Sequence, residues 1–202
     1  MIGSETGRAD RGQTLPIYIW LSAISLFAAL AFFAFAQAAS ARNGAQSAAD
    51  AAALAAVQAS RDELLSGLEI AIGGDEDWMD WLTGDVLDGG GALTAAEQFA
   101  GENDATVTGF GSTVVNGYPG FQVEIETNYA VGDSIIPGTE SLRALAKATA
   151  VLKPRCELPP NVDLGGIVEL DCDGNPIVVD PDEFRPGDLP DASVLFSVHL
   201  AE

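Results

Sequence analysis

The sequence predicts an α+β fold in which a long N-terminal helix, first transmembrane and then extended, packs on an antiparallel β-sheet. Three observations predict it. Residues 12–41 contain no charged side chain, an alanine-rich stretch follows them directly, and the second half of the chain alternates apolar and polar residues between turn signals. The first two observations describe one helix, and the third describes the sheet.

The uncharged run is long enough to cross a bilayer. Its centre, Leu15–Ala39, has 25 residues. As an α-helix this centre spans roughly 37 Å, more than the ~30 Å of a hydrocarbon core. Tyr18 and Trp20 lie near one end, where amphipathic rings favour the headgroup region. The run therefore predicts a membrane span.

A cleaved signal peptide is the alternative. Arg8 and Arg11 precede the run, and Ala36-Gln37-Ala38 resembles a cleavage site. Signal peptides have apolar regions of about 7–15 residues, so the length favours a retained helix. Two arginines before the run against Arg42 after it favour a cytoplasmic N-terminus. We expect a single-pass protein of the cell membrane with an extracytoplasmic C-terminal domain.

The formal net charge is −21, and most of it follows the span. Nucleic acids and anionic membrane surfaces are bound by basic patches, so this charge argues against both partners for the external domain. An acidic surface also keeps a domain soluble, which explains the charge without a partner.

The helix is expected to continue beyond the membrane. Asn43–Ser60 is half alanine, and no Gly or Pro follows Gly44 until Gly67. Larger apolar residues then recur on one helical face, interrupted by Arg61: Leu54, Val57, Leu64, Leu65, Leu68 and Ile72. Gly73-Gly74 would end the helix. A continuous helix from Leu15 to Ile72 would be roughly 87 Å long.

The rest of the chain predicts short helices and then strands. Trp78 and Trp81 suggest a short amphipathic lid on the core, with a partner-binding motif as the alternative. A short helix is expected over residues 94–101. Strands are expected over 105–115, 121–131, 141–152 and 193–200, with a hairpin over 167–180. Residues 141–152 are helical by propensity, but their alternation favours a strand.

The expected organisation follows from these elements. It comprises a cytoplasmic leader (1–12), the transmembrane helix (13–41), an alanine-rich helix continuing the span (42–73), an acidic linker with tryptophans and short helices (74–104), and an antiparallel sheet region (105–202). Cys156 and Cys172 are the only cysteines, and an isolated pair in an exported domain usually forms a disulfide. The bond would close a loop of about 16 residues in the last region.

The N-terminal quarter resembles a known family. The stretch from Asp10 to Ala56 joins an "RG" leader, an apolar span and the block QSAADAAALAA, Gln46–Ala56. This combination resembles the TadG/TadE-like proteins of the tight-adherence (Flp) pilus system. The resemblance implies a pilin-like, membrane-anchored structural or assembly component, with no enzymatic activity and no cofactor. Its implied partners are other Tad/Flp pilus proteins or pilin, contacted through the N-terminal helix, and the lipid bilayer.

One feature departs from processed pilins, which are usually cut after a Gly with a Glu five residues into the mature chain. A cut after Gly12 would place Ile17 at that position. The departure favours a permanently anchored, TadG-like protein. The alternative class is a membrane-tethered or secreted acidic binding module, possibly dependent on Ca²⁺, for an envelope or extracellular partner.

One stretch has metal-ligand spacing. Asp171, Asp173, Asn175 and Asp182 follow the spacing of an EF-hand loop, which makes them a weak Ca²⁺ candidate. Pro176 stands where that loop needs Gly, and an Asp-Gly hairpin explains the same residues more simply. No catalytic motif is present. His199 is expected to pack or face solvent, and the pair Glu124 and Glu126 to form a solvated strand face.

The alanine-rich stretch carries the functional hypothesis. Small residues let helices approach closely, and van der Waals contact drives helix association in membranes. We expect one helical face to pack against a neighbouring helix of the pilus apparatus: Ala45, Ala48, Ala49, Asp50, Ala52, Ala55, Ala56 and Ala59. The alternative is a passive stalk that lifts the domain off the bilayer.

Overall fold

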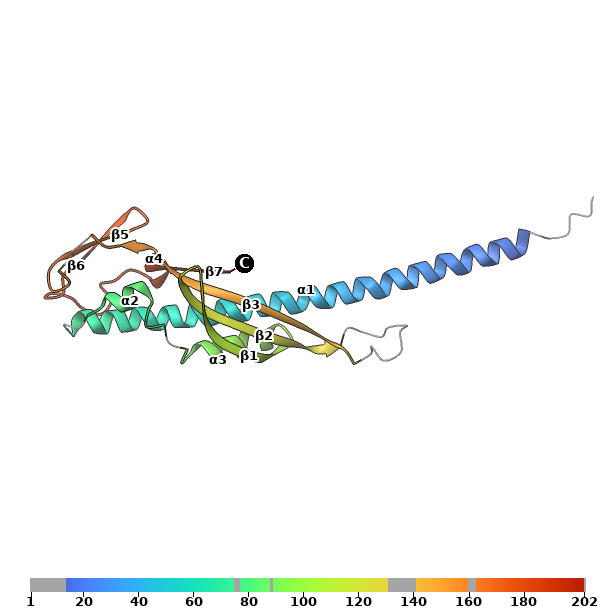
Figure 1. Cartoon of the computed structure of the whole chain (residues 1–202), viewed down its shortest axis with the longest axis horizontal. Helices are drawn as coiled ribbons and strands as arrows, with labels where there is room; N and C mark the ends of the chain where they lie inside the picture. Colours follow the sequence, from blue (N-terminus) through green and yellow to red (C-terminus); the bar gives the residue numbers. More distant parts are fainter. Residues whose placement is uncertain (1–13, 75–76, 88, 131–140, 160–162, 202) are drawn as a thin grey trace, which may run out of the picture.

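One uninterrupted helix dominates the computed structural model, which describes residues 14–74, 77–87, 89–130, 141–159 and 163–201. This helix, α1 (Thr14–Gly73), has 60 residues. At 1.5 Å per residue it is roughly 90 Å long. The continuous helix expected from the sequence is confirmed. Its N-terminal half extends away from the molecule, and the other elements gather around its C-terminal half (Figure 1).

Four antiparallel strands form the main sheet, in the order β1-β2-β3-β7. Their bounds are β1 Ala105–Val115, β2 Tyr118–Ala130, β3 Arg143–Pro154 and β7 Phe196–Leu200. Asn116 and Gly117 join β1 to β2 with φ of 53° and 85°. Positive φ at both residues is the hairpin geometry that matches the twist of the strands. The third strand, β3, is also a strand as the alternation of its residues predicted, although helix propensity alone would have predicted a helix there.

A smaller sheet, ordered β4-β5-β6, follows the main one. It contains β4 (Cys156–Glu157), β5 (Val168–Cys172) and β6 (Asn175–Val179). Asp173 and Gly174 turn β5 into β6, again with positive φ at both residues. The predicted disulfide between Cys156 and Cys172 is confirmed, and it joins residues that pair across β4 and β5.

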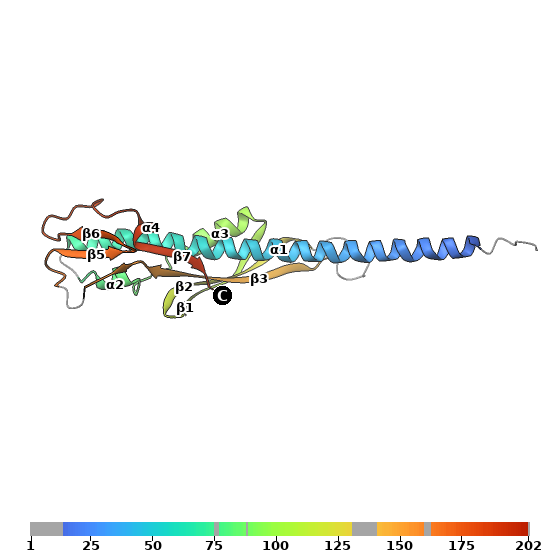
Figure 2. The same ribbon diagram turned by 90° about the horizontal axis from the view of Figure 1, so that it is seen from above.

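Two short helices complete the packing around α1. α2 (Met79–Thr83) follows Trp78, which is 2% exposed and donates its indole N–H to the Leu164 carbonyl oxygen at 3.4 Å. The Trp81 ring lies against Gly67 of α1, where a Cβ atom would overlap it. The expected lid on the core is confirmed. α3 (Ala92–Glu102) packs beside α1, on the side away from the sheet in Figure 2.

The last strand begins later than the sequence suggested. Residues 193–195 were expected in the strand but belong to α4 (Ala192–Leu195), and the strand starts at Phe196. The reason is a helix cap, since Asp191 Oδ1 accepts a hydrogen bond from the Ser193 N–H at 2.8 Å. Hydrogen bonds from the side chain and then the backbone of Ser193, and more weakly the charge of Arg61, hold the pKa of Asp191 below its ordinary value.

The core lies between the second half of α1 and one face of the main sheet. On β2 this face consists of four buried residues that alternate along the strand, as predicted: Phe121, Val123, Ile125 and Thr127. Tyr129 continues the same alternation but is 40% exposed. The stripe predicted on α1 is buried at Val57, Leu64, Leu68 and Ile72 and partly buried at Leu54 and Leu65. The second half of the long helix thus forms one wall of the folded domain.

Candidate functional site

The two halves of α1 differ in both side-chain size and exposure. From Leu15 to Phe35 the large apolar side chains are exposed, with Trp20 at 70% and Phe35 at 74%. Burial begins at Ala41 and continues to Ile72. The helix contains a segment long and apolar enough to cross a membrane, and none of that segment is buried inside the protein. The exposed half therefore has the properties of a membrane span.

The residues singled out in the alanine-rich stretch lie inside the protein's own domain. We call the alanine face the seven residues Ala45, Ala48, Ala49, Ala52, Ala55, Ala56 and Ala59. All are buried except the half-buried Ala59, and Asp50 beside them is also half-buried. Their partners are β3, β2 and α3, all of which contact α1. The structure brings the predicted residues together on one surface.

The partner strand is also built from alanines. On β3, four alanines alternate toward α1, and each is buried or half-buried: Ala144, Ala146, Ala148 and Ala150. A helix and a strand that both present methyl groups pack with their backbones close together. Interiors are packed to near crystal density, so a larger side chain on either surface would have to displace the other element. Small side chains here set the distance between helix and sheet.

This arrangement differs from the expected intermolecular contact. The sequence led us to expect a neighbouring helix of the pilus apparatus against the alanine face. In the structure the same side chains are already covered by the chain's own sheet and by α3. A helix from another protein would reach them only if those elements moved away. The stretch is not a bare stalk either, because it forms part of the domain core.

The polar residues of this stretch close an open edge of the sheet. Strand β7 pairs with β3 only from Ala150 to Pro154, and Ala201 donates its N–H to the Thr149 carbonyl oxygen. Beyond that point, Gln46 Nε2 donates to the Lys147 carbonyl oxygen at 3.4 Å, and to Asp50 Oδ1 at 2.8 Å. A side chain of α1 thus satisfies a β3 carbonyl that is paired with no strand in the described part of the chain.

The one glycine of the stretch accommodates an aromatic ring. The Tyr129 hydroxyl lies where a Cβ atom on Gly44 would be, so only glycine leaves the space. Tyr129 and Ala130 of β2, together with Gln37, Ser40 and Ala41 of α1, line an open surface hollow. The end of β2 therefore contacts α1 directly beside the exposed apolar half.

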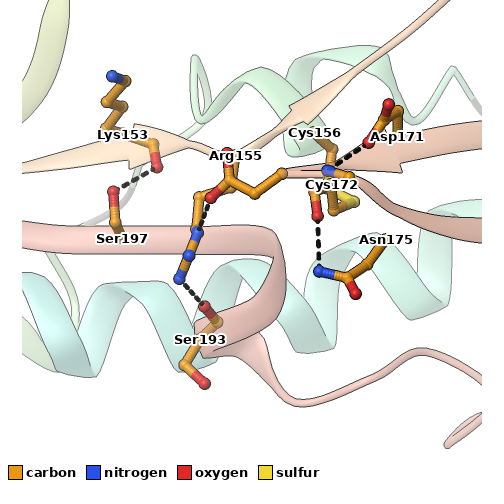
Figure 3. Close-up of polar contacts among 10 residues, drawn as sticks. Lys153, Arg155, Cys156, Asp171, Cys172, Asn175, Ser193 and Ser197 are labelled. Atoms are coloured by element: carbon orange, nitrogen blue, oxygen red, sulfur yellow. Dashed lines mark hydrogen bonds and ion pairs between the residues drawn. A yellow bond between two sulfur atoms is a disulfide. The ribbon is translucent and has the colours of Figure 1, made fainter.

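A second cluster joins the two sheets. Arg155 follows β3, and its Nε donates to Asp173 Oδ2 at 2.6 Å while its Nη1 donates to the Ser193 carbonyl oxygen at 2.9 Å. Figure 3 shows this side chain pointing toward Ser193, with the disulfide to its right. Its backbone N–H donates to Leu195 and its carbonyl accepts from Asp173. One residue thus links β3, the β5–β6 turn and α4, close to the bond between Cys156 and Cys172.

The weak calcium candidate does not assemble. Asp173 is paired with Arg155, and Asp171 Oδ1 accepts the Gly174 N–H at 2.7 Å within the hairpin turn. Asn175 donates its amide to the Cys172 carbonyl oxygen, and the N–H of Asp182 bonds to Asp180. Among the described residues no group of three or more His, Cys, Asp or Glu side chains could hold a metal ion. The β5–β6 hairpin accounts for Asp171, Asp173 and Asn175, and Asp182 lies beyond it.

The acidic pair on β2 lies on the solvent face of the sheet. Glu124 is exposed and lies opposite Lys147 in the register, and Glu126 forms an ion pair with Arg143 at 3.3 Å. Opposite charges in these positions stabilise neighbouring strands. His199 is exposed on β7. Both observations agree with the solvated roles expected for these residues.

Comparison with protein families identifies the N-terminal region. A family model described as "Putative Flp pilus-assembly TadE/G-like" matches residues 12–59. This segment is TadE/G-like. The resemblance seen in the sequence is thereby confirmed for about a quarter of the chain, and it supports a protein related to Tad/Flp pilus assembly. Comparison with the curated proteins and with the solved structures gave no match.

The TadE/G-like segment lies mostly within α1 and ends before that helix does. It covers the exposed apolar half of α1 and the whole alanine face, and it ends at residue 59, before the larger apolar side chains at Leu64 and Leu68. The family sequence thus includes the surface on which β2, β3 and α3 pack. Sequence reasoning found this surface but missed its partner on β3, and it missed Arg155, which stands in no motif.

Proposed function

We propose that the protein is a membrane-anchored structural or assembly component, minor-pilin-like, of a Tad/Flp-type pilus or a related envelope secretion apparatus. The observation that carries the proposal is the position of the TadE/G-like segment on a single helix whose first half is apolar and exposed and whose second half is part of a folded domain. Such a helix fixes the domain to the membrane without a flexible joint.

In this proposal the N-terminus is cytoplasmic and the C-terminal domain is extracytoplasmic. The disulfide supports the outer location, because such bonds persist in oxidising compartments. The net charge of −21 and the hydrogen-bonded surface carboxylates are those of a soluble outer domain. The role is structural: partners are other pilus proteins, and no residue is assigned to catalysis.

Contacts with other pilus proteins are proposed for the exposed half of α1. The alanine face is covered by the protein's own domain, whereas Phe33 is 59% exposed and lies in the apolar half. Exposed apolar surface on a membrane helix has lipid or another helix as its only partners. Helix packing in the membrane, together with contacts of the outer domain, would then join the protein to the apparatus.

The experiment is site-specific crosslinking in cells that make the complete pilus system. A photoreactive phenylalanine analogue replaces Phe33 in one strain and Ile70, which is 74% exposed at the far end of α1, in the control strain. We expect the membrane-embedded probe to crosslink other Tad/Flp components, and the control probe to give a different set of products. Crosslinks from Phe33 to lipid alone, with no pilus component co-purifying in detergent, would contradict the proposal.

A further inference from the structure

The sheet approaches α1 near the end of its apolar segment. We call the near end of the sheet the residues Tyr129, Ala130, Leu142 and Arg143. Arg143 is the register partner of Ala130, so the ends of β2 and β3 lie at the same level. Tyr129 and Ala130 share a surface hollow with Gln37, Ser40 and Ala41 of α1. This contact gives the level of the sheet along the helix axis.

The rise per residue of α1 gives the depth of this contact relative to the bilayer. If the hydrocarbon core is spanned by Leu15–Phe35, a length of roughly 30 Å, then Gln37 to Ala41 lie roughly 3–9 Å beyond it. The headgroup layer adds about 5–8 Å on each side of the core. The near end of the sheet therefore lies at headgroup depth. If Trp20 lies at the inner interface instead, the spanning residues are shifted toward the C-terminus of α1. The near end of the sheet then lies still deeper in the bilayer.

The chemistry of the near end fits such a layer. Tyr129 is 40% exposed and Leu142 is 53% exposed. Arg42 of α1 is exposed at the same level, and the Arg143 side chain is 49% exposed despite its ion pair with Glu126. Tyrosine and leucine bury apolar surface at an interface, and guanidinium groups bind phosphates with paired donors. The chain has only nine basic residues in total against 30 acidic ones, so two at this level matter.

We propose that the near end of the sheet, with Arg42, docks on the headgroup layer of the bilayer and binds lipid phosphates. The external domain is then held against the membrane at a fixed orientation instead of standing on a stalk. The inference rests on the proposed membrane span and adds a second membrane contact to it. It departs from the expectation from net charge, because in this proposal an acidic domain presents basic side chains at the level where it meets the lipid.

The test uses tryptophan quenching in the full-length protein, reconstituted in vesicles of phosphatidylcholine and phosphatidylglycerol that carry bromine near the headgroups. Leu142→Trp places a reporter in the near end, and Val114→Trp is the matched control. Val114 is 67% exposed on β1, beside the hairpin at the opposite end of the same sheet. We expect bromolipid to quench the emission added by Leu142→Trp and to leave the emission added by Val114→Trp unquenched.

A charge variant tests the phosphate contact. In the Leu142→Trp protein, Arg42→Gln with Arg143→Gln should lose most of the added quenching. The matched control, Lys147→Gln with Lys153→Gln, removes two charges from β3 at roughly 13 and 33 Å along the strand from Arg143, beyond a Debye length, and should retain it. Equal quenching in the two double variants would overturn the role of the arginines.

The native tryptophans separate this inference from the proposed function. Trp20 lies in the span, whereas Trp78 and Trp81 are near the other end of α1. Quenching of Trp20 with no added quenching from Leu142→Trp would overturn the docking and keep the span. An unquenched Trp20 would overturn the span, and the docking with it.

Discussion

The two halves of α1 have opposite relations between side-chain size and burial. In the first half, Phe and Leu side chains are exposed, while in the second half alanines are fully buried. In a soluble protein the large apolar residues would be the buried ones. The two halves therefore differ in what surrounds them: the first is exposed and has the properties of a membrane span, and the second packs against the chain's own β-sheet.

The comparison also explains why the alanine stretch needs tertiary structure. Alanine is the best helix former but buries little area per residue. The alanines of α1 pack against a matching row of alanine methyl groups on β3, so the stretch depends on that strand for its contacts. Larger side chains return at Leu64, Leu68 and Ile72, which are buried in the same core cluster.

The largest expected effect comes from placing large side chains in the buried half of α1. Ala48→Leu with Ala52→Leu puts large side chains at two positions that are 0% exposed. Overpacking costs about 1–3 kcal/mol per site, so we expect the pair to destabilise the external domain by roughly 2–6 kcal/mol or to prevent its folding. The measurement is chemical denaturation of the full chain in detergent, followed by near-ultraviolet circular dichroism.

Two control variants place leucine at exposed positions of α1. Ser47→Leu changes the exposed neighbour of Ala48, and Ala31→Leu makes the same substitution in the membrane half, where the side chain is exposed. Both should leave the stability of the domain within about 0.5 kcal/mol of wild type. If the buried pair behaved like these controls, the alanine face would not pack on the sheet as described.

The second prediction concerns the stability of the main sheet when the disulfide between Cys156 and Cys172 is removed. Cys156→Ala with Cys172→Ala removes a bond between residues 16 apart. In the chain-entropy model this costs about 3 kcal/mol. We expect hydrogen exchange to rise in β4, β5 and β6, while the amides of β2 and β3 keep their protection. Equal loss of protection in both sheets would mean that the main sheet depends on the disulfide.

The elements were predictable from the sequence, whereas their pairing was not. Period 3.6 and period 2 identified the helix and β3, and Asn116-Gly117 and Asp173-Gly174 identified the hairpins. Yet an alanine carries no sign of what covers it. The packing of α1 on β3 joins parts of the chain that are far apart in sequence, as Gln46 and Lys147 are at 101 positions. The same methyl pattern is equally compatible with another protein's helix.

The functional residues show the same limit. A local pattern was enough for the disulfide and for the Asp173-Gly174 turn, because both depend on nearby residues. Arg155 makes its contacts with residues 18 and 38 positions away, so no motif indicates it. Gly44 likewise stands in no motif. Only the position of the Tyr129 hydroxyl shows that a side chain there has no space.

A smaller effect on stability is expected from substituting Gly44, which lies at the boundary between the two halves of α1. Gly→Ala in a helix gains about 1 kcal/mol from propensity, but here the added methyl group meets the Tyr129 hydroxyl. We expect Gly44→Ala to be neutral or destabilising in the wild type and stabilising by up to about 1 kcal/mol in the Tyr129→Phe background. A double-mutant cycle by denaturation measures the coupling.

Gly101→Ala is the control for this cycle, because a Cβ on Gly101 of α3 meets no atom within 4 Å. Its effect should be the same in both backgrounds. If Gly44→Ala were equally stabilising with Tyr or Phe at position 129, the sheet would not touch α1 at that point. The depth assigned to the near end of the sheet would then lose its support.

The smallest effect concerns a cap that is tied to the second half of α1. Hydrogen bonds from Ser193, and more weakly the charge of Arg61 on α1, lower the pKa of Asp191 from its ordinary value of 3.8. A lowered folded-state pKa means that the charged cap stabilises the fold above the unfolded-state pKa. This contribution is lost as the pH falls through the folded-state pKa. Nuclear magnetic resonance titration of the Asp191 carboxyl should give a midpoint below 3.8.

Two variants then separate the causes of that shift. Asp191→Asn keeps a capping side chain without a titrating group, so its acid unfolding should lack this contribution while its stability near neutral pH stays close to wild type. Arg61→Gln should raise the Asp191 midpoint only slightly, because the bonds from Ser193 are the larger cause. A midpoint that returned to the ordinary value in Arg61→Gln would make α1, and not the cap, the main source of the shift. The C-terminal segment would then depend on the buried half of the helix as closely as β3 does.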